Sequence, residues 1–485
     1  MSKLNGIHIV KRGNISRQQM VLYRIIAVLL ALVTGGLFIL AMGYNPLSVY
    51  GTMVTGSLGS QMVIKETVKQ AVPLLISALG ITLAFRMHFW NIGAEGQICF
   101  GATCATFFAL NFPDWPQWLM LTVMFLAAAI GGGLYGVIPA YFKAKFGTNE
   151  TLFTLMLNYA ALYFIQYLRD GPWKSPEAMG FNFISRFGKN AQLPQVLGVH
   201  IGWIFALALT VLVYIYINYT KHGYEISVVG ANSRTARYAG MNNKWIIIRT
   251  MFLSAAICGV AGMIQVAGPD RTLTDSVAGG VGFTAIIIAY LGQLNPLVIL
   301  LVTVLFSILE KGSGTVQSTY NISTAAADVL QGIYINHTSQ GRSLRAVGEN
   351  PAAADAMGVN VTLYKYVHIL LGGGICALGG AYVIIVTCNG LWTYNCINGL
   401  GWIAVALVIF AGWSPYRVII GSLVFGALSV LRLYTPASVA NIPQAIFMML
   451  PFIATAVVLV VTSIHPSHKH QQPKSCGVNY YREDR

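Results

Sequence analysis

Long apolar runs alternate with short polar segments along almost the whole chain. Most runs are about 14 to 24 residues long, close to the roughly 20 residues that a helix needs to cross a bilayer core. The pattern therefore predicts an all-α polytopic membrane protein with about 14 transmembrane helices. We expect these spans at about 22–43, 67–85, 95–111, 119–142, 151–168, 200–219, 246–268, 280–294, 297–310, 322–337, 367–388, 399–412, 416–434 and 443–463.

One polar loop and the spans behind it occur twice. Residues 223–245 align without a gap with residues 341–363, and the matches continue into the apolar runs that follow each copy. A fixed repeat of this kind indicates that one structural unit is present twice, at least in part. The aligned identities include Gly223/Gly341, Gly230/Gly348, Asn232/Asn350, Ala236/Ala354, Gly240/Gly358, Cys258/Cys376 and, after a one-residue slip, Gly280/Gly399, Gly282/Gly401 and Pro296/Pro415.

Each copy of the loop carries the signals of a short helix. In the second copy, Asn350 is a good N-cap, Pro351 suits the first helical position and Gly358 suits the left-handed position after the last turn. The first copy has its N-cap at Asn232 or Ser233. Helices of about two turns are unstable alone, so two related ones favour docking elements for a cytoplasmic partner over plain connectors. The candidate docking residues are Asn232, Ser233, Arg234, Ala236, Arg237, Gly240, Asn350, Pro351, Ala354 and Gly358.

The polar segment NIGAEGQICFGA at 91–102 interrupts the apolar pattern before the third span. Asn91 is predicted to cap a helix whose first turn carries Glu95, where the helix dipole favours an acid. Acids and amides are costly in lipid, so Glu95, Gln97 and Asn158 of the fifth span must face protein or water. Two interpretations stay open. These four side chains either hold helices together or line the translocation pathway.

Composition supports a membrane protein and limits its chemistry. The chain is 56% hydrophobic and 9% charged, with a mean hydropathy of +0.64, whereas soluble domains are about 25% charged. The net charge of +15 resides mainly in alternate loops, as the positive-inside rule requires, which places both termini in the cytoplasm and argues against nucleic acid. Seven scattered cysteines have no metal-ligand spacing, so we interpret them as packing residues and expect no metal site.

Three segments give the chain a resemblance to permease subunits of ABC importers. They are NIGAEGQ at 91–97, NETLFTLMLNYAAL at 149–162, and GANSRTARYAGM at 230–241 with its following span. The resemblance is to the branched-chain amino acid, ribose and nucleoside branch, and above all to its simple-sugar and nucleoside permeases. It implies import of a nucleoside or simple sugar across a bacterial inner or plasma membrane.

The same resemblance implies partners rather than catalysis by this chain. No G-x-x-x-x-G-K-[ST] phosphate loop is present, so ATP is expected to be used by cytoplasmic ATP-binding subunits, and this chain is expected to bind no cofactor and to be no enzyme. The other implied partners are an extracytoplasmic substrate-binding protein, the lipid bilayer and a second permease chain.

The resemblance covers the two parts of the chain unequally. Residues 1–333 resemble a nearly complete permease. Residues 334–485 resemble only the C-terminal half of a second one, with a basic cytoplasmic tail, because no second NIGAEGQ-like segment precedes RAVGENPAAADAMG at 345–358. The chain is therefore expected to supply one permease core and part of another.

The join between the two parts falls in the weak span at 322–337. This span has about 16 residues and carries Asp328, yet it must cross if the loop with Arg342 and Arg345 is to lie inside. Two alternatives to a working importer stay open. One is a deletion-fusion that inserts without transporting, and the other is an ion-coupled secondary transporter, for which intramembrane acids are few here.

Overall fold

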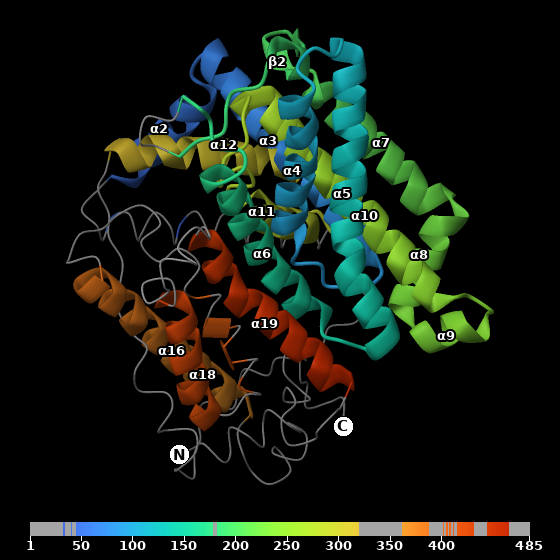
Figure 1. Cartoon of the computed structure of the whole chain (residues 1–485), viewed down its shortest axis with the longest axis vertical. Coiled ribbons are helices and arrows are strands. Elements are labelled where there is room, and N and C mark those ends of the chain that lie inside the picture. Colours follow the sequence, from blue (N-terminus) through green and yellow to red (C-terminus); the bar gives the residue numbers. More distant parts are fainter. Residues whose placement is uncertain are drawn as a thin grey trace.

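The computed structural model describes residues 45–177, 182–319, 361–387, 415–430 and 444–464, with isolated positions elsewhere (Figure 1). Within these residues the protein is almost entirely helical, and six helices are long and apolar enough to cross a membrane. The prediction of an all-α polytopic membrane protein is therefore confirmed. The number of fourteen spans stays a prediction, because those expected at 22–43, 322–337 and 399–412 lie wholly or mostly outside the described residues.

The first part of the chain contributes most of the described elements. Its helices are α2 (Pro46–Leu58), α3 (Gln61–Arg86), α4 (Ala94–Asn111), α5 (Gln117–Phe146), α6 (Glu150–Asp170), α7 (Gly202–Tyr219), α8 (Lys221–Ala231), α9 (Ser233–Tyr238), α10 (Asn243–Gln265), α11 (Val281–Leu291) and α12 (Pro296–Thr319). Between α6 and α7 lie a 3₁₀ turn (Lys189–Ala191) and a hairpin of β1 (Gln195–Val196) and β2 (Val199–His200). The C-terminal part contributes α16 (Val361–Tyr382), α18 (Pro415–Val430) and α19 (Gln444–Ile464).

The core lies where α3, α4, α5 and α10 pack together (Figure 1). Glycines allow the close approach: a Cβ on Gly101 of α4 would lie 2.4 Å from the Cα of Gly259 of α10, and one on Gly132 of α5 would lie 2.8 Å from the carbonyl oxygen of Ala255. Small residues at such crossings favour helix association in membranes, where no hydrophobic force draws helices together. Because α4 is enclosed by its neighbours, its less apolar sequence is tolerated.

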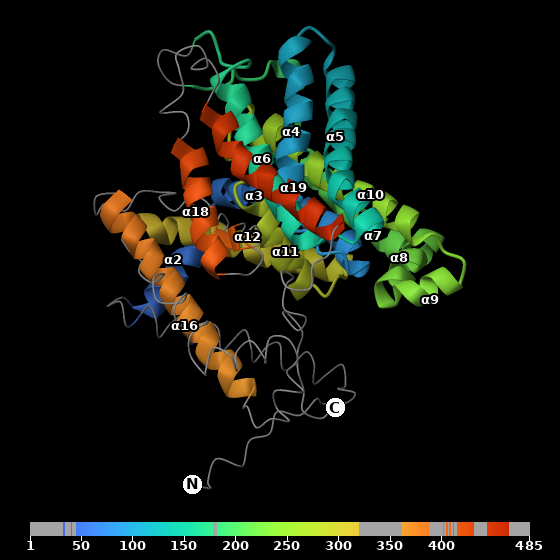
Figure 2. The same ribbon diagram turned by 60° about the horizontal axis from the view of Figure 1, so that its bottom comes forward.

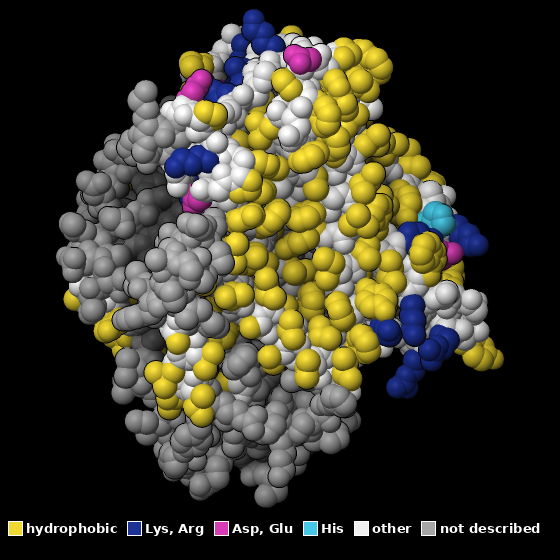
Figure 3. All heavy atoms as spheres, viewed as in Figure 1, with side chains coloured by type: hydrophobic (Ala, Val, Ile, Leu, Met, Phe, Trp, Pro, Cys, Tyr) yellow, Lys and Arg dark blue, Asp and Glu magenta, His cyan; other side chains and the backbone are white. Residues whose placement is uncertain are grey.

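The surface of the described helices is divided by side-chain type. In Figure 3, hydrophobic side chains cover the broad middle of the visible face, and Lys and Arg side chains gather near its top and around α8 and α9 at the lower right. This distribution is that of a protein with an apolar belt in lipid and charged ends in water. It agrees with the positive-inside assignment of the α8–α9 segment to one membrane face.

Two helices were not predicted, and one begins earlier than expected. Asn45 accepts a hydrogen bond from the N–H of Leu47 and starts α2, a helix of 13 residues. Ser60 caps α3, so this helix begins at Gln61 rather than near residue 67. The polar part of the loop at 220–245 contains α8, capped by Thr220. These helices were missed because polar and charged residues mask the apolar pattern on which the prediction rested.

The expected span at 280–294 is wrong as a complete crossing. The helix α11 has 11 residues, or about 16 Å at 1.5 Å per residue, against a bilayer core of about 30 Å. Gly280 has a φ of +84° before the helix, and Gln293 and Leu294 have φ values of +53° and +54° after it. These left-handed residues end the helix at both sides.

The repeat is visible in the described structure. The helices α10 and α16 both run into a π-helical segment, Val266–Asp270 and Val383–Thr387 respectively. The helices α12 and α18 both begin at the aligned prolines. In the C-terminal part, α19 packs against α6, with the rings of Phe452 and Tyr159 stacked at 4.7 Å. Figure 2 shows α16 standing apart from the α3–α10 bundle.

Candidate functional site

Asn91 and Gln97 form a closed amide pair at the start of α4. Asn91 Nδ2 donates to Gln97 Oε1 at 3.1 Å, and Gln97 Nε2 donates back to Asn91 Oδ1 at 3.0 Å. The two residues are 0% and 2% exposed. Each amide therefore satisfies the other inside the protein, which offsets most of the free energy needed to bury it.

The prediction that Asn91 caps this helix is wrong in detail. The helix begins at Ala94 after Gly93, and the N-cap position has no side-chain hydrogen bond. Asn91 Oδ1 instead accepts from the N–H of Gly93 at 3.0 Å, one residue before the helix. Asn91 thus stabilises the turn that leads into α4, and the same side chain also hydrogen-bonds the amide of Gln97.

Asn158 ties this turn to the middle of α6. Its Oδ1 accepts from the N–H of Gly96 at 2.8 Å, and its Nδ2 donates to the carbonyl oxygen of Ile92 at 2.8 Å. Thr154, one turn earlier on α6, accepts from the N–H of Ile92 at 3.2 Å. A Cβ on Gly96 would lie 2.9 Å from the Cα of Asn158, so glycine is needed for this approach.

The Glu95 carboxylate reaches from the first turn of α4 to the start of α11. Its Oε1 accepts from the N–H of Gly280 and its Oε2 from the N–H of Gly282, both at 2.7 Å. The described segment around α11 supplies no side-chain cap of its own. Glu95 therefore provides the acceptors and the negative charge that a helix N-terminus favours. A Cβ on Gly282 would lie 2.3 Å from the nitrogen of Glu95.

The structure thus brings the four predicted polar side chains into one buried group. Asn91, Glu95, Gln97 and Asn158 are all less than 10% exposed, and their hydrogen bonds join α4 to α6 and α11. Such a group can fix three helices relative to one another with a geometry that apolar packing alone does not specify.

A polar cavity of about 240 Å³ lies next to the Glu95–Gly280 contact. Its wall includes Gly279 and Val281, which flank the Gly280 N–H that Glu95 holds. Gln70 Oε1 is buried without a hydrogen-bond partner among the described residues. The polar lining residues are Glu66, Lys69, Gln70, Gln265, Ser276, Glu310 and Lys311.

The charges of this cavity are balanced. Glu66 and Lys69 form an ion pair at 2.7 Å, and the lining holds two acids and two lysines in total. Amide and hydroxyl groups supply further hydrogen-bond donors and acceptors. The arrangement suits a neutral molecule with several hydrogen-bonding groups, because no net charge favours an anion or a cation.

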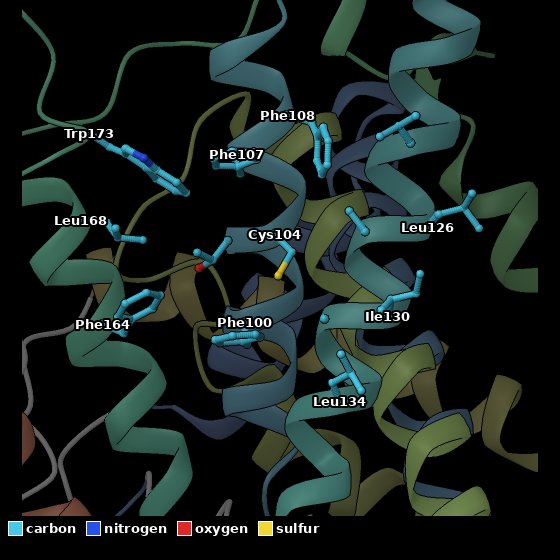
Figure 4. Close-up of a pocket in the computed structure, with 14 residues that line it drawn as sticks. Phe100, Cys104, Phe107, Phe108, Leu126, Ile130, Leu134, Phe164, Leu168 and Trp173 are labelled. Atoms are coloured by element: carbon cyan, nitrogen blue, oxygen red, sulfur yellow. The ribbon is translucent and has the colours of Figure 1, made fainter.

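A second, larger hollow of about 620 Å³ lies between α4, α5 and α6. Figure 4 shows aromatic and aliphatic side chains around it, with Phe100, Phe107 and Phe108 on α4 and Leu126 on α5. The lining offers almost no hydrogen-bonding groups. This groove matches the hydrocarbon around a membrane protein and not a polar substrate.

The predicted docking helix of the first copy is present as α9. Asn232 is its N-cap and accepts from the N–H groups of Arg234 and Thr235 at 2.9 and 3.3 Å. Gly240 follows the helix with a φ of +76°. Ala236 is 0% exposed, whereas Tyr238 is 96% exposed. The helix therefore packs through Ala236 and presents its opposite face to solvent, including Ser233, Arg234 and Arg237.

The adjoining helix α8 rests on the end of α3. A Cβ on Gly230 would lie 2.3 Å from the carbonyl oxygen of Arg86, so α8 packs directly against the backbone of the turn after α3. His88 Nδ1 hydrogen-bonds the carbonyl oxygen of Gly230. The α8–α9 segment is therefore connected to the membrane bundle through this contact as well as through α10.

Glu225 links α8 to α10. Its Oε2 accepts from Arg249 Nη2 at 2.9 Å, and Arg249 Nη1 lies 2.7 Å from His222 Nδ1. Burial raises the pKa of Glu225, but hydrogen bonds and charge from Arg249 and His222 outweigh it, so the pKa falls below its usual value. Glu225 is therefore ionised at neutral pH and holds Arg249 as a charged partner.

The candidate docking residues of the second copy lie outside the described residues. They are Asn350, Pro351, Ala354 and Gly358. Within the part of the chain that the structure describes, no group of three or more His, Cys, Asp or Glu side chains is arranged to hold a metal ion.

Sequence reasoning missed the partners of Glu95 and the role of Arg249. Gly280 and Gly282 align with identical glycines, Gly399 and Gly401, in the second copy of the repeat. These repeated glycines were the signal that the two positions have a structural role. Arg249 offered no such signal, because its contact with Glu225 depends on how α8 folds back along α10.

The family comparison agrees with the repeat. The chain matches the family described as branched-chain amino acid transport system, permease component, over residues 63–335 and again over residues 333–459. The two matches meet at residues 333–335. No solved structure matches the chain significantly.

Several curated relatives match most of their own length. The glucose ABC transporter permease protein TsgB13 of Haloferax volcanii is 32% identical over 324 residues, which are 64% of this chain and 85% of that protein. The guanosine ABC transporter permease protein NupP of Bacillus subtilis is 30% identical, with coverage of 69% and 97%. The nucleoside ABC transporter permease protein NupB of Lactococcus lactis is 31% identical, with coverage of 61% and 85%.

These relatives do not favour an ion-coupled transporter or a non-transporting fusion. The repeated family match, the relatives and the apolar helices point to one class of protein. The chain belongs to the branched-chain amino acid transport system permease family, and it is the multi-pass, non-enzymatic permease subunit of an ABC importer.

Proposed function

We propose that this permease imports neutral nucleosides or simple sugars, driven by ATP hydrolysis in separate cytoplasmic subunits that dock on α9. The observation that carries the proposal is the course of α10. This helix starts at Asn243, five residues after α9 ends, and with its π-helical extension it spans 28 residues up to Asp270. Gln265 and Pro269, near its end, line the polar cavity. One helix therefore connects the docking element to the cavity.

The proposed orientation follows from the charges. The segment with α8 and α9 carries Lys221, Arg234 and Arg237, so the positive-inside rule favours the cytoplasmic side for it. The cavity then lies toward the outer side, where an extracytoplasmic binding protein delivers the substrate. Both termini lie in the cytoplasm of a bacterial cell under this orientation.

The substrate class follows from the relatives and from the cavity. The relatives are named for glucose, guanosine and nucleosides, which are neutral molecules rich in hydrogen-bonding groups. The cavity offers Gln70, Gln265 and Ser276 beside a closed Glu66–Lys69 ion pair. An amino acid zwitterion would have to open that pair to satisfy its own two charges, which costs binding free energy.

The four buried polar residues act on the pathway by positioning its wall. Glu95 accepts a hydrogen bond from the N–H of Gly280, whose two neighbours in the chain line the cavity. Asn91, Gln97 and Asn158 fix the start of α4, which carries Glu95. Their side chains are occupied by protein partners. We therefore assign them to helix position and not to direct contact with substrate.

The second repeat loop is proposed to dock a second ATP-binding subunit through Asn350, Pro351, Ala354 and Gly358. Residues 1–333 would act as the nearly complete unit and residues 334–485 as the partial one, with ATP bound by the partners and no cofactor held by this chain. The second permease core that such an importer needs would come from another chain.

The proposal is tested by uptake into vesicles that contain the permease, its ATP-binding subunits and its binding protein. Labelled guanosine or glucose should enter only with ATP on the cytoplasmic side, and unlabelled leucine in large excess should not compete. Uptake that follows an imposed proton or sodium gradient without ATP would overturn the importer mechanism. Competition by leucine would overturn the substrate class.

Variants of two glutamines on α3 test the cavity. Gln70→Leu should raise the KM for uptake by about tenfold, because a buried polar contact to substrate is lost. Gln61→Leu, on the exposed first turn of the same helix, is the matched control and should leave the KM unchanged. Equal effects of both variants would remove the cavity from the pathway.

A further inference from the structure

We propose that Arg169 is a positioning residue of the transport pathway, because through Asp275 it fixes Ser276 in the wall of the polar cavity. Arg169 lies at the C-terminal end of α6 and is not among the residues that line the cavity. The inference rests on the proposed function, since it takes this cavity as part of the pathway of the substrate.

The cavity wall between the π-helical end of α10 and the start of α11 consists of turns and bends. Ser276 and Gly279 line the cavity, whereas Val277 and Ala278 are 3% and 2% exposed and pack into the core. The hydroxyl of Ser276 lies 3.3 Å from that of Thr274. Because no helix or sheet ladder holds this segment, the position of the Ser276 hydroxyl depends on the contacts of its neighbours in the chain.

Two charge-assisted hydrogen bonds hold the wall segment, one at each end. At the end next to α11, the carboxylate of Glu95 accepts from the N–H of Gly280 at 2.7 Å. At the other end, Arg169 Nη1 donates to Asp275 Oδ2, also at 2.7 Å. Asp275 directly precedes Ser276, so the contact with Arg169 fixes the polar part of the wall.

The guanidinium of Arg169 is itself oriented by a second carboxylate. Its Nε donates to Asp170 Oδ1 at 2.9 Å, and the same oxygen accepts from Asn182 Nδ2 at 3.1 Å. The planar guanidinium therefore bridges Asp170 and Asp275 in a defined direction, which a flexible point charge would not do. The side chains of Arg169 and Asp275 are 25% and 39% exposed, so water weakens the pair only in part.

The helix α6 supports both ends of the wall. Asn158 in its middle hydrogen-bonds the N–H of Gly96 and the carbonyl oxygen of Ile92, in the turn and first residues around Glu95. Arg169 lies eleven residues further along the same helix, or about 16 Å at 1.5 Å per residue. One helix thus positions the wall directly at its Asp275 end and through Glu95 at its Gly280 end.

A fixed wall lowers the free-energy cost of binding. When Ser276 already has its final position, little conformational freedom is lost as a substrate hydrogen-bonds to it. Removal of Arg169 should therefore raise the KM for uptake. The maximal rate per permease should stay near the native value, because the docking helix α9 and its contacts with α8 and α10 are unchanged.

The first measurement is amide hydrogen exchange of the full-length permease in nanodiscs, which needs no substrate. In Arg169→Gln, exchange in the segment 273–281 should be about fivefold faster, the factor expected for loss of a partly exposed ion pair. Asp275→Asn removes the same pair from the wall side and should have the same effect. Arg186→Gln is the matched control, since Arg186 is exposed in the loop between α6 and α7 and has no ion pair among the described residues.

The second measurement is uptake of labelled guanosine or glucose into vesicles with the ATP-binding subunits and the binding protein. The KM should rise about fivefold in Arg169→Gln and in Asp275→Asn, and it should stay native in Arg186→Gln. The double exchange of Arg169→Asp with Asp275→Arg restores a pair of opposite charges. It should bring both the KM and the amide exchange back toward the native values, whereas Arg169→Asp alone should not.

The outcomes separate this proposal from the proposed function. Native amide exchange in both Arg169→Gln and Asp275→Asn would overturn it, and so would a lower maximal rate at an unchanged KM, which indicates a purely structural role. A KM that rises in Gln70→Leu but not in Arg169→Gln would overturn this proposal alone. A KM that rises in neither variant would overturn the assignment of the cavity to the pathway, and this proposal with it.

Discussion

The carboxylate of Glu95 accepts a hydrogen bond from the backbone N–H of Gly282 at 2.7 Å, although the two residues are 187 positions apart in the sequence. This contact joins the first turn of α4 to the first turn of α11. It also lies next to the wall of the polar cavity, since Val281 lines that cavity. The shape of the cavity therefore depends on a side chain that comes from another helix.

The first prediction concerns this contact. Glu95→Ala should lower the free energy of unfolding by about 2–3 kcal/mol, because two buried N–H groups lose a charged acceptor. Glu95→Gln should have a smaller effect, since its amide oxygen still accepts one of the two hydrogen bonds. Thermal and denaturant unfolding in detergent, followed by tryptophan fluorescence, measures both variants against the native chain.

A matched control for this prediction is Glu177→Ala, which removes an acid from an exposed position of the loop between α6 and α7. This control should leave the unfolding midpoint unchanged, as surface substitutions usually do. An equal loss of stability in Glu95→Ala and Glu177→Ala would mean that the hydrogen bonds to Gly280 and Gly282 contribute no stability.

Helix positions were predictable where a helix faces lipid or the apolar core along its whole length. The spans α4, α5, α6 and α7 lie within a few residues of their expected bounds. The short helix α11 was not predictable as a partial crossing, because its sequence is as apolar as that of a full span. Its end depends on the left-handed conformations of Gln293 and Leu294, which no residue preference indicates.

The polar group was predictable in its members but not in its contacts. A buried acid and three amides stand out in an apolar chain, so Asn91, Glu95, Gln97 and Asn158 could be selected from the sequence alone. Which atoms they meet depends on long-range packing. The contact of Glu95 with Gly282 requires the fold of α4 against α11, and only the repeated glycines hinted at that position.

The second prediction concerns docking through α9. Tyr238 is 96% exposed at the end of this helix, beside the exposed Arg237. Tyr238→Ala should weaken the affinity for the ATP-binding subunits by about tenfold, since exposed tyrosines and arginines often dominate interfaces. Stimulation of ATP hydrolysis by the permease, titrated against permease concentration, measures this affinity. Tyr219→Ala, an exposed tyrosine at the end of α7, is the control and should not change it.

The third prediction concerns the link between α8 and α10. Glu225 and Arg249 are 15% and 23% exposed in their side chains, so water screens their ion pair only in part. A double-mutant cycle with Glu225→Gln and Arg249→Met should give a coupling energy of about 1–2 kcal/mol in unfolding experiments. The loss of ATPase stimulation should be similar in each single variant and no greater in the double variant. Additive losses would mean that the two residues act separately.

The fourth prediction concerns acid stability and rests on His200 in the β1–β2 hairpin. This residue is 3% exposed, and neither ring nitrogen has a hydrogen-bond partner among the described residues. Burial, with a smaller effect from the charge of Lys69, lowers the pKa of His200 to about 4. The folded protein therefore keeps this ring neutral at pH values where an unfolded histidine is protonated.

The sign of the effect follows from the protons bound in each state. Below a pH of about 6.5 the unfolded chain binds a proton at His200 and the folded chain does not, so stability should fall by about 3 kcal/mol between pH 6.5 and pH 4. His200→Leu should remove this part of the pH dependence, and Lys69→Gln should reduce it by raising the pKa of His200. Unfolding midpoints measured from pH 7.5 to 4.5 decide the matter, and a His200→Leu variant as acid-sensitive as the native chain would exclude His200 as the cause.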